Sequence, residues 1–306
     1  MKFSVIVPIY NKANTVAAAL ESIYAQSFAD FEVILVDDGS TDDLVKAIEP
    51  LQSPKLQLIR QENGGVSVAR NTGISHARGE YICFLDADDL WTADHLQTIY
   101  DLTVKYPQAG MFVTSNAVIT AEGKTLCSSD ALKGYDADFE TDDFLGLLNS
   151  TSYGIINTNS VGVRRAVLEH QGIRFEPGIR IGEDSDVWYR LGLKNKVAIS
   201  KKETTMYRRE FSSATNVSSH VQDWIFSRRE QALLADREIS DQAKKSLINL
   251  IDRYKMTSSR EYMAAGQRKA AKQVLAGVRD KSGKRYWLTR IFTLLPYSLC
   301  RRVLGK

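Results

Sequence analysis

The feature that most constrains the fold of this chain is a regular alternation of short apolar runs and helix-period stretches over residues 1 to about 116. The apolar runs cover residues 3–9, 32–36, 56–59 and 81–85, and the helix-period stretches cover residues 15–24, 42–48 and 66–76. Strand and helix units of this length, in this order, favour a parallel sheet with helices on both faces. We therefore predict an α/β chain with a Rossmann-like, mostly parallel sheet flanked by helices.

Charge and cysteine content exclude several other classes of protein. The 306 residues include 40 Lys and Arg against 37 Asp and Glu, and the resulting net charge of +3 is too small to indicate nucleic-acid binding. The three cysteines, Cys83, Cys127 and Cys300, lack metal-ligand spacing, which favours reduced thiols in a cytoplasmic protein. No signal peptide pattern and no apolar stretch of the ~20 residues that span a bilayer are found. We expect no transmembrane helix.

Polar and acidic residues follow three of the predicted strands. Pro8-Ile9-Tyr10-Asn11 follows the first strand, Asp37-Asp38-Gly39-Ser40 the second, and Asp86-Ala87-Asp88-Asp89 the fourth. In parallel sheets, ligands bind beyond the carboxyl ends of the strands, where the loops into the helices converge. The three loops are therefore expected to form one pocket.

The acidic cluster Asp86-Ala87-Asp88-Asp89 is the strongest candidate for a metal site. Alternate carboxylates in an extended loop can point the same way and offer hard oxygen ligands to Mg²⁺ or Mn²⁺. Such ions often take one or two protein carboxylates and complete their shell with water and phosphate oxygens. The alternative is an acidic helix start stabilised by the helix dipole, but capping needs one carboxylate and this loop has three.

Two further segments suit the binding of a nucleotide and a proton acceptor. Gly64-Gly65 precede a predicted helix that carries Arg70, which could lie near a diphosphate or orient the metal-site carboxylates; the alternative is that the glycines only turn the chain. Glu183 and Asp184 begin a second predicted helix. Either carboxylate could take a proton from an acceptor hydroxyl, and the alternative is again an acidic helix start.

Together these motifs resemble family 2 glycosyltransferases, which are inverting enzymes of the GT-A fold that use nucleotide sugars. The resemblance rests on Val5 to Asn11, Val36 to Asp42, Ala69-Arg70-Asn71 and Leu85 to Asp89, and it extends through Gly182-Glu183-Asp184. It covers residues 1 to about 116 strongly and fades beyond about residue 220. The resemblance implies transfer of a sugar from a nucleoside-diphosphate sugar, with UDP favoured and deoxythymidine an alternative.

The resemblance also assigns roles to residues. Asp88 would ligate a Mn²⁺ or Mg²⁺ ion, with Arg70 nearby, and Asp184 of the pair Glu183-Asp184 would be the general base. The remaining residues would contact the nucleotide or a metal-bound water: Pro8, Tyr10, Asp38, Asp86 and Ala87. His220 is a further candidate for a metal or phosphate contact, although a lone His is more often an ordinary surface residue.

Two other functions are alternatives to sugar transfer. A nucleotidyltransferase would show a glycine- and lysine-rich triphosphate loop near the first strand, and residues 10–14 are no such loop. A non-catalytic sugar-nucleotide binding module would not need both Asp88 and Asp184. The Gln-x-x-Arg-Trp type motif of processive family members is also not found, which favours addition of a single sugar to a glycan or lipid-linked acceptor.

The sequence predicts two regions. Residues 1–220 would form the glycosyltransferase domain, with a nucleotide-binding half at 1–116 and an acceptor half at 117–220, and residues 221–306 a helical C-terminal appendage. The segment 284–304 is basic, aromatic and free of acids, with Pro296 near its centre. It fits either an interfacial helix at the inner face of a membrane or a helix packed on the core or on a second subunit.

Overall fold

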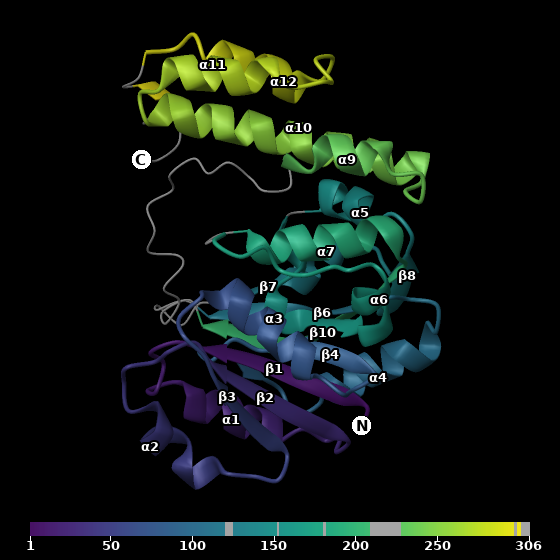
Figure 1. The fold of residues 1–306 in the computed structure, drawn as a ribbon. Helices are drawn as coiled ribbons and strands as arrows, with labels where there is room; N and C mark the ends of the chain where they lie inside the picture. Colours follow the sequence, from purple (N-terminus) through teal and green to yellow (C-terminus); the bar gives the residue numbers. More distant parts are fainter. Residues whose placement is uncertain (120–124, 152, 180–181, 209–227, 297–298, 301–306) are drawn as a thin grey trace. The chain divides into compact units, whose positions relative to one another are not determined.

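The computed structural model describes residues 1–119, 125–151, 153–179, 182–208, 228–296 and 299–300. The chain divides into two compact units, Met1–Asn216 and Val217–Lys306 (Figure 1). Each unit is described by itself below.

The N-terminal unit alternates strands and helices from its first residues. Its strands are β1 (Phe3–Ile9), β2 (Phe31–Asp37), β3 (Leu56–Arg60), β4 (Tyr81–Phe84), β5 (Leu90–Trp91), β6 (Met111–Ile119), β7 (Thr125–Cys127), β8 (Asp138–Thr141), β9 (Val161–Arg164) and β10 (Val197–Arg208). Its α-helices are α1 (Val16–Tyr24), α2 (Leu44–Ile48), α3 (Val66–His76), α4 (His95–Lys105), α5 (Phe144–Ser150), α6 (Arg165–His170) and α7 (Glu183–Lys194). Short 3-10 helices lie at Glu49–Leu51, Ser128–Leu132, Tyr153–Ile155 and Thr158–Ser160.

These strands form one sheet in the order β3-β2-β1-β4-β9-β6-β10-β5, with β7 beside β6 and β8 beside β10. The pairs β3-β2, β2-β1 and β1-β4 are parallel, as is β6-β10, whereas β9 runs antiparallel to both of its neighbours. The predicted α/β fold with a mostly parallel, helix-flanked sheet is confirmed. The sequence did not predict β9, a strand of four residues in the middle of the sheet.

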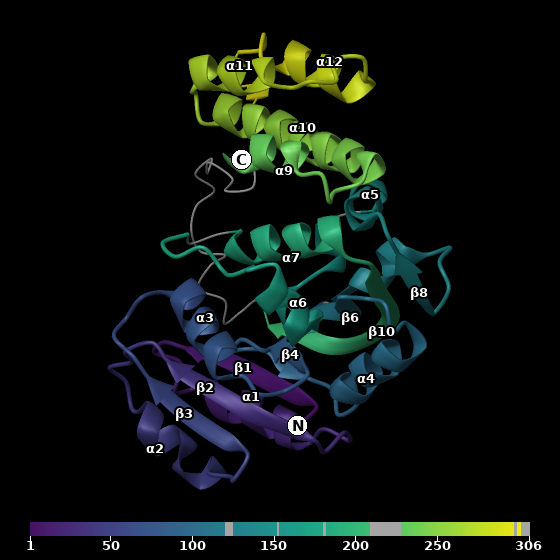
Figure 2. The same cartoon turned by 45° about the vertical axis from the view of Figure 1, so that its right-hand side comes forward.

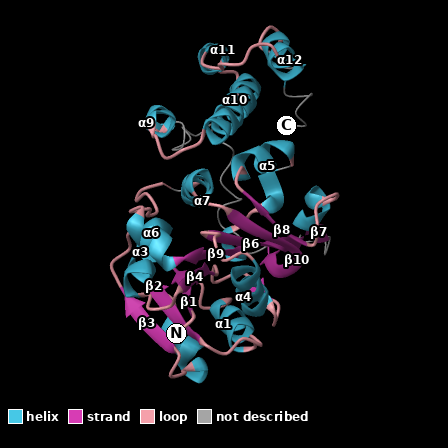
Figure 3. Cartoon of the chain, turned by 90° about the vertical axis from the view of Figure 1, so that its right-hand side faces the viewer, coloured by secondary structure: helices cyan, strands magenta, loops and turns pink. Residues whose placement is uncertain are grey.

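Helices cover both faces of the sheet, which explains why β1 is buried along its whole length (Figure 3). On one face Val5 and Val7 pack in the core cluster that contains Val16 of α1. On the other face α3 packs against β1 so closely that a Cβ at Gly73 would lie 2.4 Å from Cγ2 of Ile6. A strand that is covered by helices on both faces has apolar residues at almost every position, as β1 does.

The C-terminal unit is helical, as predicted. It contains α9 (Glu230–Ala235), α10 (Asp241–Ala264), α11 (Arg268–Ala276) and α12 (Lys284–Phe292), and α11 and α12 lie along α10 (Figures 1 and 2). A helix was predicted for the segment 284–304, of which residues 297–298 and 301–304 lie outside the described residues; in the structure α12 ends at Phe292. The reason is that the conformation of a residue before proline is biased away from the helical region. Among the helices described, none is both long and apolar enough to span a membrane.

Candidate active site

The loop after β1 and the loop after β2 are tied together by hydrogen bonds. Asn11 adopts a left-handed conformation with φ of 52°, its backbone N–H donates to Oγ of Ser40 at 3.0 Å, and its Oδ1 accepts from the N–H of Thr41 at 2.8 Å. Pro8 is buried within β1, and Tyr10, which is 49% exposed, follows that strand. The two loops therefore form one framework at the strand ends, with the Tyr10 ring open to solvent.

Asp38 organises the glycine loop before α3. Its side chain is almost fully buried, and its carboxylate accepts hydrogen bonds from the backbone N–H groups of Gly64 at 2.9 Å and Gly65 at 2.7 Å. It also accepts from Nε2 of Gln61 at 2.7 Å. Asp38 therefore fixes the conformation of the Gly64-Gly65 loop. The predicted contact of Asp38 with the nucleotide stays a prediction.

The three carboxylates after β4 have different surroundings. Asp89 is 1% exposed and accepts from the backbone N–H of Arg208 at 2.8 Å and from the side-chain amide of Asn159. Burial, followed by the charges of Asp86 and Asp88, raises the pKa of Asp89 to about 8, although both hydrogen bonds oppose this shift. The side chains of Asp86 and Asp88 are 31% and 15% exposed. Asp89 therefore supports the loop from inside, whereas the side chains of Asp86 and Asp88 stay partly exposed.

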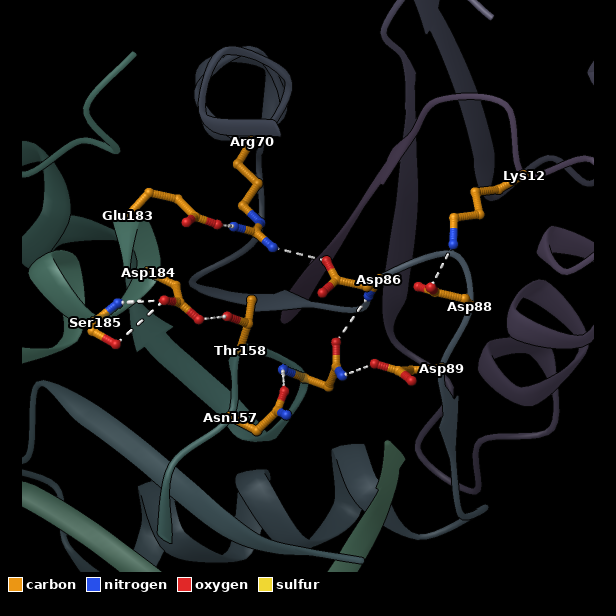
Figure 4. Close-up of polar contacts among 11 residues, drawn as sticks. Lys12, Arg70, Asp86, Asp88, Asp89, Asn157, Thr158, Glu183, Asp184 and Ser185 are labelled. Atoms are coloured by element: carbon orange, nitrogen blue, oxygen red, sulfur yellow. Dashed lines mark hydrogen bonds and ion pairs between the residues drawn. The ribbon is translucent and has the colours of Figure 1, made fainter. Parts of the chain in front are cut away.

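Asp88 is paired with a residue that the sequence analysis did not single out. Nζ of Lys12, in the loop after β1, lies 2.6 Å from Oδ2 of Asp88 (Figure 4). Nε of Arg208 donates a hydrogen bond to the backbone carbonyl of Asp88 at 2.7 Å. Within the described part of the chain, no group of three or more His, Cys, Asp or Glu side chains forms a ready metal cage. Asp86 and Asp88 still fit a Mn²⁺ or Mg²⁺ ion that takes most of its ligands from water and phosphate.

Arg70 of α3 joins the loop after β4 to the N-terminus of α7. Its side chain is 4% exposed, Nη2 lies 2.9 Å from Oδ1 of Asp86, and Nη1 lies 2.9 Å from Oε1 of Glu183 (Figure 4). The guanidinium also lies over the ring of Phe175, 5.3 Å from its centroid. Burial opposes the charge, but Asp86, Glu183 and Asp184 outweigh it and raise the pKa of Arg70. One cation thereby holds two predicted site carboxylates together.

Glu183 and Asp184 begin α7 but differ in environment. The Glu183 carboxylate is largely buried, and burial, followed by the charge of Asp184, raises its pKa to about 7 against the effect of Arg70. Asp184 is half-buried and accepts from Oγ1 of Thr158 at 2.8 Å and from the backbone N–H of Ser185 at 2.6 Å. The carboxylate of Glu183 is thus engaged by Arg70, whereas that of Asp184 is held by neutral donors.

The structure therefore brings together four of the residues predicted from the sequence: Arg70, Asp86, Glu183 and Asp184. Asp38 instead contacts the glycine loop, and His220 lies outside the described residues. The sequence analysis missed Lys12, and it missed the roles of Thr158 and Asn159. The rule that polar groups after a strand face the pocket could have identified Lys12, whereas the other two precede β9, which carries no comparable signal.

Asn159 connects the acidic loop to the centre of the sheet. It lies in the short 3-10 helix before β9 and is 1% exposed. Its Oδ1 accepts from the backbone N–H of Asp86 at 2.9 Å, and its Nδ2 donates to Asp89.

Comparisons with known proteins agree with this architecture. Residues 4–144 match the family model described as glycosyl transferase family 2. An uncharacterized glycosyltransferase of Rickettsia felis is 31% identical over 219 residues, which is 70% of this chain and 34% of that protein. Glycosyltransferase GlyA of Streptococcus pneumoniae is 39% identical over 108 residues, 34% of this chain and 15% of that protein. The chain spans about a third of the length of the Rickettsia relative.

Solved structures share the fold at low sequence identity. TarS 1-349 of S. aureus, in complex with UDP-GlcNAc, superposes with a TM-score of 0.77 at 20% identity and covers 100% of this chain and 93% of its own. Mannosyltransferase PcManGT of Pyrobaculum calidifontis, in complex with GDP-Man and Mn²⁺, has a TM-score of 0.55 at 21% identity, covering 99% of this chain and 86% of its own. With the family match and these likenesses, the chain belongs to glycosyl transferase family 2 and has the GT-A fold.

Proposed function

We propose that this chain transfers one sugar from a nucleoside-diphosphate sugar to a hydroxyl group of a glycan or lipid-linked acceptor, with inversion at the anomeric carbon. The observation that carries the proposal is the bridge made by Arg70 between Asp86 and Glu183, which are separated by 97 positions in the sequence. It joins a candidate donor loop to a candidate base. UDP is the favoured nucleotide, because TarS, which shares the fold, was solved with UDP-GlcNAc.

Asp184 is proposed as the general base. It takes the proton of the acceptor hydroxyl while the hydroxyl oxygen bonds to the anomeric carbon and the bond from that carbon to the diphosphate breaks. The half-buried carboxylate of Asp184 is held by Thr158 and Ser185 and keeps lone pairs for a substrate proton. Glu183 is bonded to Arg70 instead, so we assign it a positioning role.

Asp88 and Asp86 are proposed to hold a Mn²⁺ or Mg²⁺ ion with the diphosphate. When bound, such an ion supplies positive charge to the leaving diphosphate. Lys12 pairs with Asp88 and is therefore placed to exchange partners when a diphosphate enters. His220 is kept as a candidate contact of the same site. We propose that the nucleotide lies against Pro8, Tyr10, Asp38, Ala87 and Arg70.

We also propose which segments of the chain bind the nucleotide and which bind the acceptor. Residues 1–116 would bind the nucleotide and residues 117–220 the acceptor, while residues 221–306 would serve another purpose. The first assignment is supported by the loops after β1, β2 and β4, which all lie within residues 1–116. The assignment of the acceptor to residues 117–220 is supported by Thr158 and Asp184. Both belong to this segment, and Thr158 donates a hydrogen bond to Asp184.

Replacing Asp184 by Asn tests the base directly. We expect Asp184→Asn to bind UDP in the presence of Mn²⁺ as the wild type does, but to release UDP from UDP-GlcNAc by donor hydrolysis about 10² to 10⁴ times more slowly, the usual effect of a general base. Calorimetry measures binding and a UDP-detecting assay measures turnover. Asp101→Asn, at an exposed carboxylate of α4, is the matched control. Unchanged turnover in Asp184→Asn would contradict the assignment.

Replacing Asp88 by Ala tests the metal site. We expect Asp88→Ala to lose the difference in UDP affinity between buffers with and without Mn²⁺, because a carboxylate ligand is missing. Asp101→Ala should keep that difference. Equal Mn²⁺ dependence in wild type and Asp88→Ala would remove Asp88 from the metal site. Release of pyrophosphate from UTP with a sugar phosphate would instead favour a nucleotidyltransferase.

A further inference from the structure

Helix α12 has one face packed within the C-terminal unit. Tyr286 lies in a cluster of buried residues with Met256 of α10 and Leu275 of α11, and Phe292 lies in a second cluster with Met263 of α10. Thr289, between them on the helix, is fully buried and accepts a hydrogen bond from Nε of Arg260 at 3.0 Å. The positions 286, 289 and 292 thus anchor the helix to α10.

The opposite face of α12 is apolar and exposed. Trp287, Leu288 and Ile291 are 48%, 51% and 53% exposed, and Leu294, just beyond the helix, is 64% exposed. Leu288, Ile291 and Leu294 follow Trp287 by one, four and seven residues. At this spacing the three helical residues lie on one side of α12, and Leu294 continues the same side beyond the helix end. We call these four residues the outer face of α12. Four large apolar side chains gathered on one element are unusual for a surface that meets only water.

The surroundings of the outer face are strongly basic. Between Glu261 and Cys300, the described residues include eight Lys and Arg and a single acid, Asp280. Lys284 and Arg290 are exposed on α12 itself, and the Arg290 guanidinium lies 5.0 Å from the centroid of the Trp287 ring. An exposed apolar stripe with Trp and flanking cations is the composition that inserts at the boundary between lipid headgroups and acyl chains.

We propose that the outer face of α12 docks on an anionic lipid surface. Leu288, Ile291 and Leu294 would enter the acyl boundary, Trp287 would lie at headgroup level, and Lys284 and Arg290 would pair with lipid phosphates. A second copy of the chain is a poorer occupant, because two basic faces would repel each other. Four apolar side chains also fall well short of the 20 to 30 residues that each partner of a stable interface typically contributes.

The test is co-sedimentation of the full chain with vesicles, without any nucleotide sugar, so that the result does not depend on the proposed transfer activity. The protein is expected to sediment with vesicles of an equal mixture of phosphatidylglycerol and phosphatidylcholine, and much less with phosphatidylcholine alone. Leu288→Gln with Ile291→Gln, and separately Lys284→Gln with Arg290→Gln, should each weaken binding by about tenfold or more. The fluorescence of Trp287 should shift to the blue when mixed vesicles are added.

The matched control is Val45→Gln with Lys46→Gln on α2, where both residues are exposed. This double variant should sediment as the wild type does. The proposal is overturned if the wild type does not sediment with the mixed vesicles, or if both α12 double variants sediment as well as the wild type. It is also overturned if light scattering shows a dimer that Leu288→Gln with Ile291→Gln converts to a monomer, since a second copy would then cover the face.

Discussion

Arg70 is the residue whose replacement should disturb the site most. Arg70→Met removes a guanidinium that is 4% exposed and bonded at 2.9 Å to both Asp86 and Glu183. Breaking a buried pair by removing one partner costs about 3–5 kcal/mol, because the remaining charge is left uncompensated. Glu183 is 10% exposed and should account for most of this loss, whereas Asp86 is 31% exposed and partly solvated. We expect a loss of about 3–5 kcal/mol in the free energy of unfolding at pH 8.5.

The loss in the free energy of unfolding caused by Arg70→Met should grow as the pH rises through about 7. The pKa of Glu183 is about 7 with Arg70 present, and it rises further when Arg70 is removed, because Arg70 lowers it. Just above pH 7, the folded variant therefore binds more protons than the folded wild type, and the variant loses more stability as the pH rises. Near pH 6 both proteins carry a largely protonated Glu183. At pH 6 the difference in the free energy of unfolding between wild type and Arg70→Met should therefore be smaller than at pH 8.5 by about 1–2 kcal/mol.

Urea unfolding followed by intrinsic fluorescence measures these changes, since Trp91 and Trp188 are buried in the same unit as Arg70. Arg70→Lys keeps one charge but not the planar fork that reaches both carboxylates, so its midpoint should lie between those of wild type and Arg70→Met. Lys105→Met, which removes an exposed ion pair with Asp138, should leave the midpoint unchanged. Equal midpoints for Arg70→Met and wild type at pH 8.5, or a difference that does not change with pH, would refute the reasoning.

Two other substitutions test the packing and the base. Gly73→Ala would place a Cβ 2.4 Å from Cγ2 of Ile6 and should lower the free energy of unfolding by about 1–3 kcal/mol, whereas Gly154→Ala, with no atom within 4 Å, should not change the urea midpoint. Equal midpoints for the two variants would contradict this account of how α3 packs on β1. Thr158→Val removes the hydrogen bond that holds the Asp184 carboxylate, so the rate of UDP release from UDP-GlcNAc should fall by about tenfold while UDP binding is unchanged; an unchanged rate would contradict that role.

Much of the fold and part of the site could be predicted from the sequence. The apolar run at 3–9 and the helix-period stretch at 66–76 match β1 and α3 in both bounds, because strongly periodic segments carry their own signal. Residues after the parallel strands were expected at one edge of the sheet, and Asn11 and Ser40 do meet there. The strand β9 was not predicted, since Val-Gly-Val-Arg is short and its position between β4 and β6 depends on partners far away in the sequence.

The individual roles of the carboxylates could not be predicted either. Asp86, Asp88 and Asp89 are near neighbours in the sequence, and their spacing alone does not show which of the three side chains is buried. Their burial separates them, because Asn159 and the Arg208 backbone hold Asp89 inside while the other two stay accessible. This difference arises from segments that come more than 65 residues later in the chain. The partner of a side chain is a property of the tertiary packing rather than of the local pattern.

The bridge made by Arg70 couples two loops that the sequence presents as independent motifs. Asp86 follows β4 and Glu183 begins α7, so a movement of either loop away from α3 would leave the buried guanidinium with one carboxylate instead of two. The cost of an uncompensated buried charge opposes such a movement. Substitution of Arg70 should therefore impair UDP binding and UDP release together, whereas Asp184→Asn and Thr158→Val should impair release alone. Because Asp184 directly follows Glu183, the guanidinium that contacts Asp86 in the loop after β4 also constrains the position of the proposed base.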